Sequence, residues 1–120
     1  MSRFVDIEAS DEITLANGDK VTVRQRLTAP EDAELVRRLM RMRIDAKTGA
    51  VQAEEGDWHL QRVHICEAYL LGWDFRDDEG KVMGFERALI RQLDQDTVVE
   101  IATAIDALQA ARREAAEKKG

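Results

Sequence analysis

Tyr69-Leu-Leu-Gly-Trp-Asp-Phe-Arg-Asp-Asp-Glu-Gly-Lys81 is the most informative segment of this chain. Its apolar first part ends at Trp73 and gives way to a dense acidic turn that Gly80 closes. The pattern predicts an aromatic residue packed in the core, followed by a solvated turn in which Asp side chains bond to local amides. The segment holds no nucleophile and no recognisable set of metal ligands, which favours a protein that binds other proteins.

Residues 11–27 predict a β-hairpin, because polar and apolar residues alternate on both sides of an Asn-Gly pair. The apolar positions are Ile13, Leu15, Val21 and Val23. A two-residue loop would put the two apolar pairs on opposite faces, whereas a three-residue loop over 16–18 puts them on one. Burial specifies register, so we expect a type I turn with Gly18 in the left-handed bulge position. Residues 4–7 are candidates for a third strand.

Residues 28–111 predict a helical body of about four helices. Thr28-Ala-Pro-Glu31 is a helix start, in which Thr28 and Glu31 form a capping box and proline occupies the first turn. The first helix runs to about residue 44 along an apolar stripe of Leu35, Val36, Leu39 and Met40. Residues 45–56 contain two glycines and no periodic pattern, so we predict a mobile loop there.

A second helix is predicted over residues 58–71, with Asp57 as its N-cap and Gly72 after its end. Its expected inner face is Leu60, Val63, His64, Glu67, Leu70 and Leu71. A strand over 63–71 is the alternative, because the apolar residues there also tolerate an extended backbone.

Two further helices complete the predicted body after an extended segment over 73–83. The short one covers 85–93, with Ala88, Leu89 and Leu93 inward. Asp94 caps the last helix, whose inner stripe is Val98, Ile101, Ala102, Ile105 and Leu108. Residues 112–120 are polar all round and predict a frayed tail. The fold class is therefore α+β, mainly α, as one domain over 1–111.

Composition narrows the possible partners and the compartment. Hydrophobic residues make up 44% and charged residues 35% of the chain, which separates it from disordered sequences. The net charge is −6 and no basic half or tail is set aside for phosphate, so no nucleic-acid partner is expected. The longest apolar run is far too short to cross a bilayer, and the N-terminus lacks a signal-peptide core, so no membrane partner is expected. A lone cysteine, Cys66, fits a reducing compartment, and we predict a cytoplasmic protein that is bacterial or made inside a bacterium.

Candidate chemistry is weak in every segment. His59, His64 and Cys66 are close in sequence, but the two histidines fall on different faces of a helix and lack further ligands at usable spacing. A calcium loop around Asp77 and Glu79 would place Phe75 at the first ligand position, where it cannot coordinate. We therefore predict no metal, no cofactor, no catalytic residue and no enzymatic activity.

Surface contacts with a protein partner are the remaining possibility. Arg37, Arg38, Arg41 and Arg43 form a basic patch on the first helix, which either pairs with upstream carboxylates or docks an acidic partner. Met42 and Trp58 have the adaptable or aromatic character of binding surfaces. The predicted partner-binding residues are Arg38, Arg41, Met42, Trp58, Ile65 and Tyr69.

The segment quoted first, a short amphipathic helix after it, and Leu93-Asp94-x-Asp96 opening a longer helix resemble the tail assembly chaperones of long-tailed bacteriophages. The resemblance covers about residues 60–108. It implies a mainly helical, self-associating protein that coats the tape measure protein before the tail tube protein polymerises around it. The alternatives are a structural component of the virion, such as a neck, connector or baseplate protein in a symmetric ring, and a non-viral regulatory module.

Overall fold

The computed structural model describes the backbone of residues 3–48 and 55–119 and the side chains of 3–39 and 60–117. The elements in chain order are β1 (Ser10–Thr14), β2 (Lys20–Arg24), α1 (Ala29–Thr48), α2 (Glu55–Tyr69), β3 (Leu70–Trp73), the 3-10 helix η1 (Arg87–Gln92) and α3 (Gln95–Lys119). Among the described residues, helix far exceeds strand, and the three strands form one antiparallel sheet, which confirms the predicted α+β, mainly α class.

The N-terminal hairpin has the predicted register. Ile13 lies opposite Val21, and the Leu15 amide donates to the Asp19 carbonyl at 2.7 Å, which leaves three residues in the loop. Gly18 has a φ of +96°, the left-handed conformation expected of the bulge position. Leu15, Val21 and Val23 are buried on one face of the sheet, so the requirement to bury them set the loop length.

The third strand is β3, and the prediction of a strand over residues 4–7 is wrong. The sheet order is β1-β2-β3, and β3 pairs antiparallel with β2, placing Trp73 opposite Val21. Near the N-terminus a turn, in which the Ala9 amide donates to the Asp6 carbonyl at 3.1 Å, directs the chain away from the sheet. Phe4 is accordingly 85% exposed.

The predicted second helix and the alternative strand are each partly correct, because the segment is a helix at first and a strand at its end. Helix α2 continues to Tyr69, and the chain becomes extended at the next residue, Leu70, which is fully buried. The inner face of α2 includes Val63 and also Cys66, which was not expected there. Leu71 was expected inside but is 37% exposed, because the switch to strand geometry turns it to the open face of the sheet.

Helix α1 starts as predicted and ends later than predicted. The Thr28 amide and hydroxyl donate to Glu31 Oε1 at 2.9 and 2.7 Å, completing the capping box. A hydrogen bond from Arg24, then those from Thr28, lower the pKa of Glu31 to about 2. The predicted loop 45–56 is helical at 45–48 and 55–56, so Asp57 is not the N-cap. Residues 49–54 lie outside the described part.

Helix α3 contributes four buried residues to the core. The Thr97 amide donates to the Asp94 side chain at 3.3 Å, confirming the cap. The predicted stripe is buried at Val98, Ile101, Ala102 and Ile105, with Leu108 packed against it. The segment before it is a 3-10 helix whose buried residue is Ile90, while Ala88, which was expected inward, is exposed.

The segment predicted as a frayed tail, 112–120, is helical as far as Lys119, where α3 ends. Arg112, its first residue, forms an ion pair with Asp11 of β1, and just before it the Gln109 amide donates to the Gln25 carbonyl at 3.1 Å. These two polar contacts attach α3 to β1 and to the end of β2 at the start of this segment.

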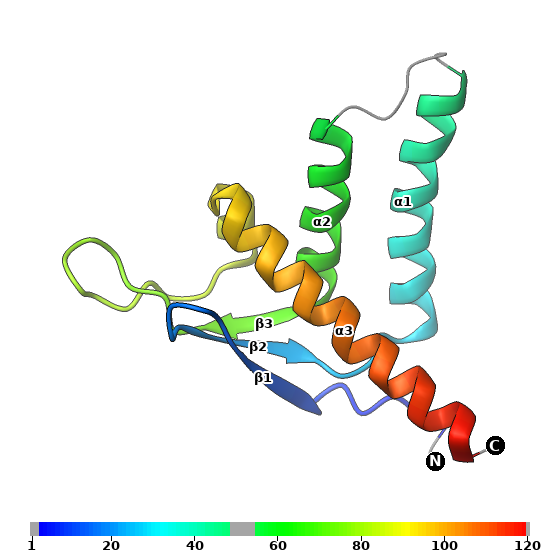
Figure 1. The fold of residues 1–120 in the computed structure, drawn as a ribbon, viewed down its shortest axis with the longest axis horizontal. Helices are drawn as coiled ribbons and strands as arrows, with labels where there is room; N and C mark the ends of the chain where they lie inside the picture. Colours follow the sequence, from blue (N-terminus) through cyan, green and yellow to red (C-terminus); the bar gives the residue numbers. More distant parts are fainter. Residues whose placement is uncertain (1–2, 49–54, 120) are drawn as a thin grey trace.

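The elements form two layers. Helix α3 crosses one face of the sheet, α1 and α2 lie side by side as an antiparallel pair, and the chain between β3 and η1 projects from the sheet (Figure 1). The core lies between the inner face of the sheet, α2 and α3. The opposite face of the sheet is open and carries the exposed side chain of Leu71.

Replacing Gly18 by alanine tests the loop register. A Cβ at Gly18 meets nothing within 4 Å, so the cost comes only from its φ of +96°. We expect Gly18→Ala to lower the free energy of unfolding by about 1–2 kcal/mol, the penalty for a left-handed residue with a Cβ. Gly84→Ala, which also meets open space but at an ordinary φ, is the control and should change stability little. Equal effects in urea titrations would contradict the register.

Candidate functional site

Three aromatic rings gather at the end of β3. Trp73 stacks on Phe75, with centroids 5.0 Å apart and planes inclined by 21°. Phe85 meets Trp73 edge-on at 4.7 Å and 75°. The indole Nε1 of Trp73 donates to the Met83 carbonyl at 2.8 Å, so the ring is fixed on its polar edge as well as its faces.

The chain from Phe75 to Met83 forms an acidic hairpin beside these rings. The Met83 amide donates to the Phe75 carbonyl at 2.7 Å, and Arg76 bridges to Val82. Asp77 Oδ1 accepts the amides of Glu79 and Lys81 at 2.9 Å each. This oxygen therefore organises the turn, as the sequence predicted for an Asp-rich reverse turn.

A groove of about 430 Å³ opens between this hairpin, the β1–β2 loop, η1 and the start of α3. We call it the aromatic groove. Its apolar lining is Leu15, Trp73, Phe75, Met83, Leu89 and Leu93. Met83 is 40% exposed, and the neighbouring Val82 is 55% exposed. The groove therefore offers an apolar floor that water can reach, the usual character of a ligand or protein contact site.

The rim of the aromatic groove is acidic. Its charged residues are Asp19, Asp77, Asp78, Glu100 and Arg76. Three of the carboxylates accept hydrogen bonds from neutral amides: Glu100 from Ala16 at 2.6 Å, Asp19 from Asn17 at 2.8 Å, and Asp77 from its own turn. Amide partners leave the negative charge uncompensated. Arg76, the one cation, donates to the Gly80 carbonyl at 2.8 Å.

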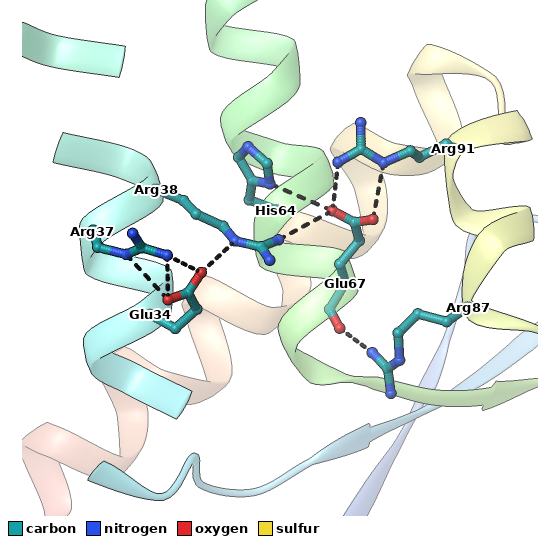
Figure 2. Close-up of polar contacts among 7 residues, drawn as sticks. All are labelled: Glu34, Arg37, Arg38, His64, Glu67, Arg87 and Arg91. Carbon is teal, nitrogen blue, oxygen red and sulfur yellow. Dashed lines mark hydrogen bonds and ion pairs between the residues drawn. The ribbon is translucent and has the colours of Figure 1, made fainter. Parts of the chain in front are cut away.

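A second groove, of about 520 Å³, lies between α1, α2 and η1. Glu67 lines this groove, and its side chain is only 17% exposed. Figure 2 shows the side chains that surround its carboxylate. Arg91 binds the Glu67 carboxylate through two nitrogens at 3.0 Å each, and His64 Nδ1 lies 3.4 Å from it. Arg38 of α1 approaches the same carboxylate at 4.0 Å. One carboxylate thus connects three helical segments.

Arg87 closes the C-terminal end of α2. Its guanidinium donates to the main-chain carbonyls of Glu67 and, at 3.4 Å, of Leu70. The last turn of α2 has no basic residue of its own, so η1 supplies the donor that its terminal carbonyls need. The hydrogen bonds fall where helix changes to strand, so they support that change.

The second groove is electrically balanced. Its lining has three arginines and three glutamates, and each arginine has a partner within the chain. Arg24 pairs with Glu31, Arg38 binds Glu34 at 3.1 Å, and Arg87 bonds to carbonyls. Two nitrogens of Arg24, Nε and Nη2, are buried and have no hydrogen-bond partner among the described residues. We therefore interpret this cluster as a contact that joins helices.

The predicted partner-binding residues whose side chains are described, Arg38, Ile65 and Tyr69, do not form one exposed surface. Tyr69 is 9% exposed and packs in the core, which corrects its expected surface role, and burial raises its pKa. Ile65 is half-buried against the core. Arg38 is engaged by Glu34 and Glu67, in line with the self-paired interpretation of the basic patch. The side chains of Arg41, Met42 and Trp58 lie outside the described part.

The residues of the aromatic groove were missed as a site by sequence reasoning. Trp73 was predicted to lie in the core, while Met83, Leu89 and Leu93 come from later elements. The available signal was the spacing of Trp73, Phe75 and Phe85 around an acidic turn. Nothing local indicated that Leu15 and Glu100 would join them.

The metal and thiol candidates have no site around them in the described part. No three His, Cys, Asp or Glu side chains there are grouped to hold a metal ion. The Cys66 thiol is buried and lies 3.8 Å from the Val98 carbonyl. Burial, followed by the charges of Glu67 and Asp106, raises its pKa to about 12. A thiol so rarely ionised is a poor nucleophile.

No model of a known protein family matches the chain, and neither a curated protein nor a solved structure matches it. Among the described helices, none is both long and apolar enough to cross a bilayer.

The reactivity of Cys66 tests the packing behind the groove. With its pKa raised to about 12, the folded protein at pH 8 should react with iodoacetamide at least about a hundredfold more slowly than the same protein in urea. Mass spectrometry measures both rates. Comparable rates would show that the α2–α3 contact opens readily.

Proposed function

We propose that this protein is a non-catalytic protein-binding factor, a phage tail assembly chaperone that coats the tape measure protein and helps the tail tube protein assemble. The aromatic groove is the observation that carries the proposal. It combines an accessible tryptophan, an exposed methionine and a charged rim, which are features of protein contact surfaces.

The position of the resemblance supports the same proposal. The residues that resemble tail assembly chaperones, about 60–108, extend over α2, β3, the acidic hairpin, η1 and most of α3. Of these elements, β3, the acidic hairpin, η1 and the start of α3 line the aromatic groove together with the β1–β2 loop. The segment that suggests the class therefore also builds the candidate contact site.

Reversible binding is the activity that such a factor needs. A chaperone that leaves before the tube closes needs apolar contacts strong enough to shield its client and weak enough to release it. A solvent-accessible groove with a charged rim meets that need, since buried apolar contacts slow dissociation and rim charges mainly govern encounter. We propose the host cytoplasm as the place of action and a homo-oligomer as the working form.

Co-expression tests the proposed function. The protein should co-purify with a fragment of the tape measure protein from its own phage, and it should be absent from purified particles. A fragment of equal length with its apolar positions changed to serine is the matched control and should not be retained. Presence in particles at a fixed copy number would instead support a structural virion component, and failure to form any complex would contradict the chaperone role.

A further inference from the structure

On the basis of the protein-binding function proposed above, we infer that the aromatic groove holds an apolar side chain of a client segment whose neighbouring lysine or arginine pairs with the acidic rim. The occupant is thus a basic and apolar stretch of another protein.

The floor of the groove indicates which apolar side chain the client segment would place there. Trp73 and Phe75 are stacked and half-buried, so they present fixed ring surface that loses little freedom on binding. Met83 contributes a flexible, 40% exposed side chain beside them. A rigid aromatic surface next to an adaptable thioether suits aliphatic or aromatic side chains of more than one shape.

The rim of the groove indicates that the client segment carries a lysine or arginine next to this apolar side chain. Four carboxylates and one guanidinium line the groove, and the guanidinium already donates to the Gly80 carbonyl. Asp78 has no hydrogen-bond or ion-pair partner among the described residues and is exposed at the mouth of the groove. A cation placed there gains attraction from several carboxylates at once, whereas an acidic segment meets repulsion.

The second groove provides an internal comparison. It has a similar volume, but each of its three glutamates pairs with an arginine: Glu31 with Arg24, Glu34 with Arg38 and Glu67 with Arg91 of η1. A charged client would have to break these pairs before gaining its own. The uncompensated negative charge therefore favours the aromatic groove as the docking site, and it requires the partner segment to be positively charged.

Two synthetic peptides test the inference on the full chain. They have the same length and the same leucine positions, and the flanking residues are lysine in one and glutamate in the other. A Trp58→Phe background leaves Trp73 as the only tryptophan, so its emission reports occupation of the groove. We expect the lysine peptide to bind at least about tenfold more tightly than the glutamate peptide, with an affinity that falls as salt is added.

Charge reversal at two adjacent residues locates the contact. Asp78 lines the groove and Glu79 does not, yet both are exposed in the same turn. Asp78→Lys should weaken binding of the lysine peptide about tenfold, whereas Glu79→Lys, with the same change in net charge, should weaken it less than about threefold. Circular dichroism of both variants confirms that each remains folded.

Several outcomes would overturn the inference. Equal binding of the two peptides, or equal effects of the two substitutions, would remove the role of the acidic rim. Trp73 emission that changes with protein concentration alone would assign the groove to a second copy of this chain. Absence of binding by either peptide would reject the inferred client motif even if the tape measure fragment co-purifies, which separates this failure from failure of the proposed function.

Discussion

The antiparallel pairing of β3 with β2 is the constraint on which the other features depend. It makes β2 the central strand, buries Leu70 opposite Val23 and sets Trp73 opposite Val21. Because β3 follows α2 without a loop, the same pairing fixes where α2 leaves the sheet. Arg87 then bonds to the carbonyls on both sides of the change from helix to strand. The position of the aromatic groove follows from this junction.

The two grooves are similar in size but differ in how their charged side chains are paired. Around Glu67, each negative charge faces an arginine, and the result is a contact that joins α1, α2 and η1 (Figure 2). Around Trp73, the carboxylates bond to amides and keep their charge. The carboxylates around Glu67 are paired within the chain and hold the helices together. Among the described residues, the carboxylates around Trp73 lack such partners and remain available to another protein. This division supports a protein that works by docking.

Sequence patterns correctly predicted the features that depend on interactions between residues close together in the chain. The loop over 16–18, the Thr28–Glu31 capping box and the buried stripe of α3 depend on residues within a few positions of one another, and all three are confirmed. The end of α2 was not predicted to the residue, because the sequence at Leu70 is compatible with either helix or strand. Only its pairing with β2 decides between them. The groove was not predicted, since it joins Leu15 and Glu100 to Trp73 from distant parts of the chain. The partner-binding residues were chosen by residue type, and Tyr69 shows why type alone fails, because it is buried in a core that residues from distant parts of the chain form together.

Hydrogen exchange of the protein bound to its client fragment tests the central claim most directly. The amides of Asp77 and Met83 close the acidic hairpin by hydrogen bonds to Lys81 and Phe75, and they lie beside the aromatic floor. The account predicts that the client slows exchange in residues 75–83 and in η1 and leaves residues 31–39 of α1 unchanged. Slower exchange confined to α1, with the hairpin exchanging as in the free protein, would contradict it.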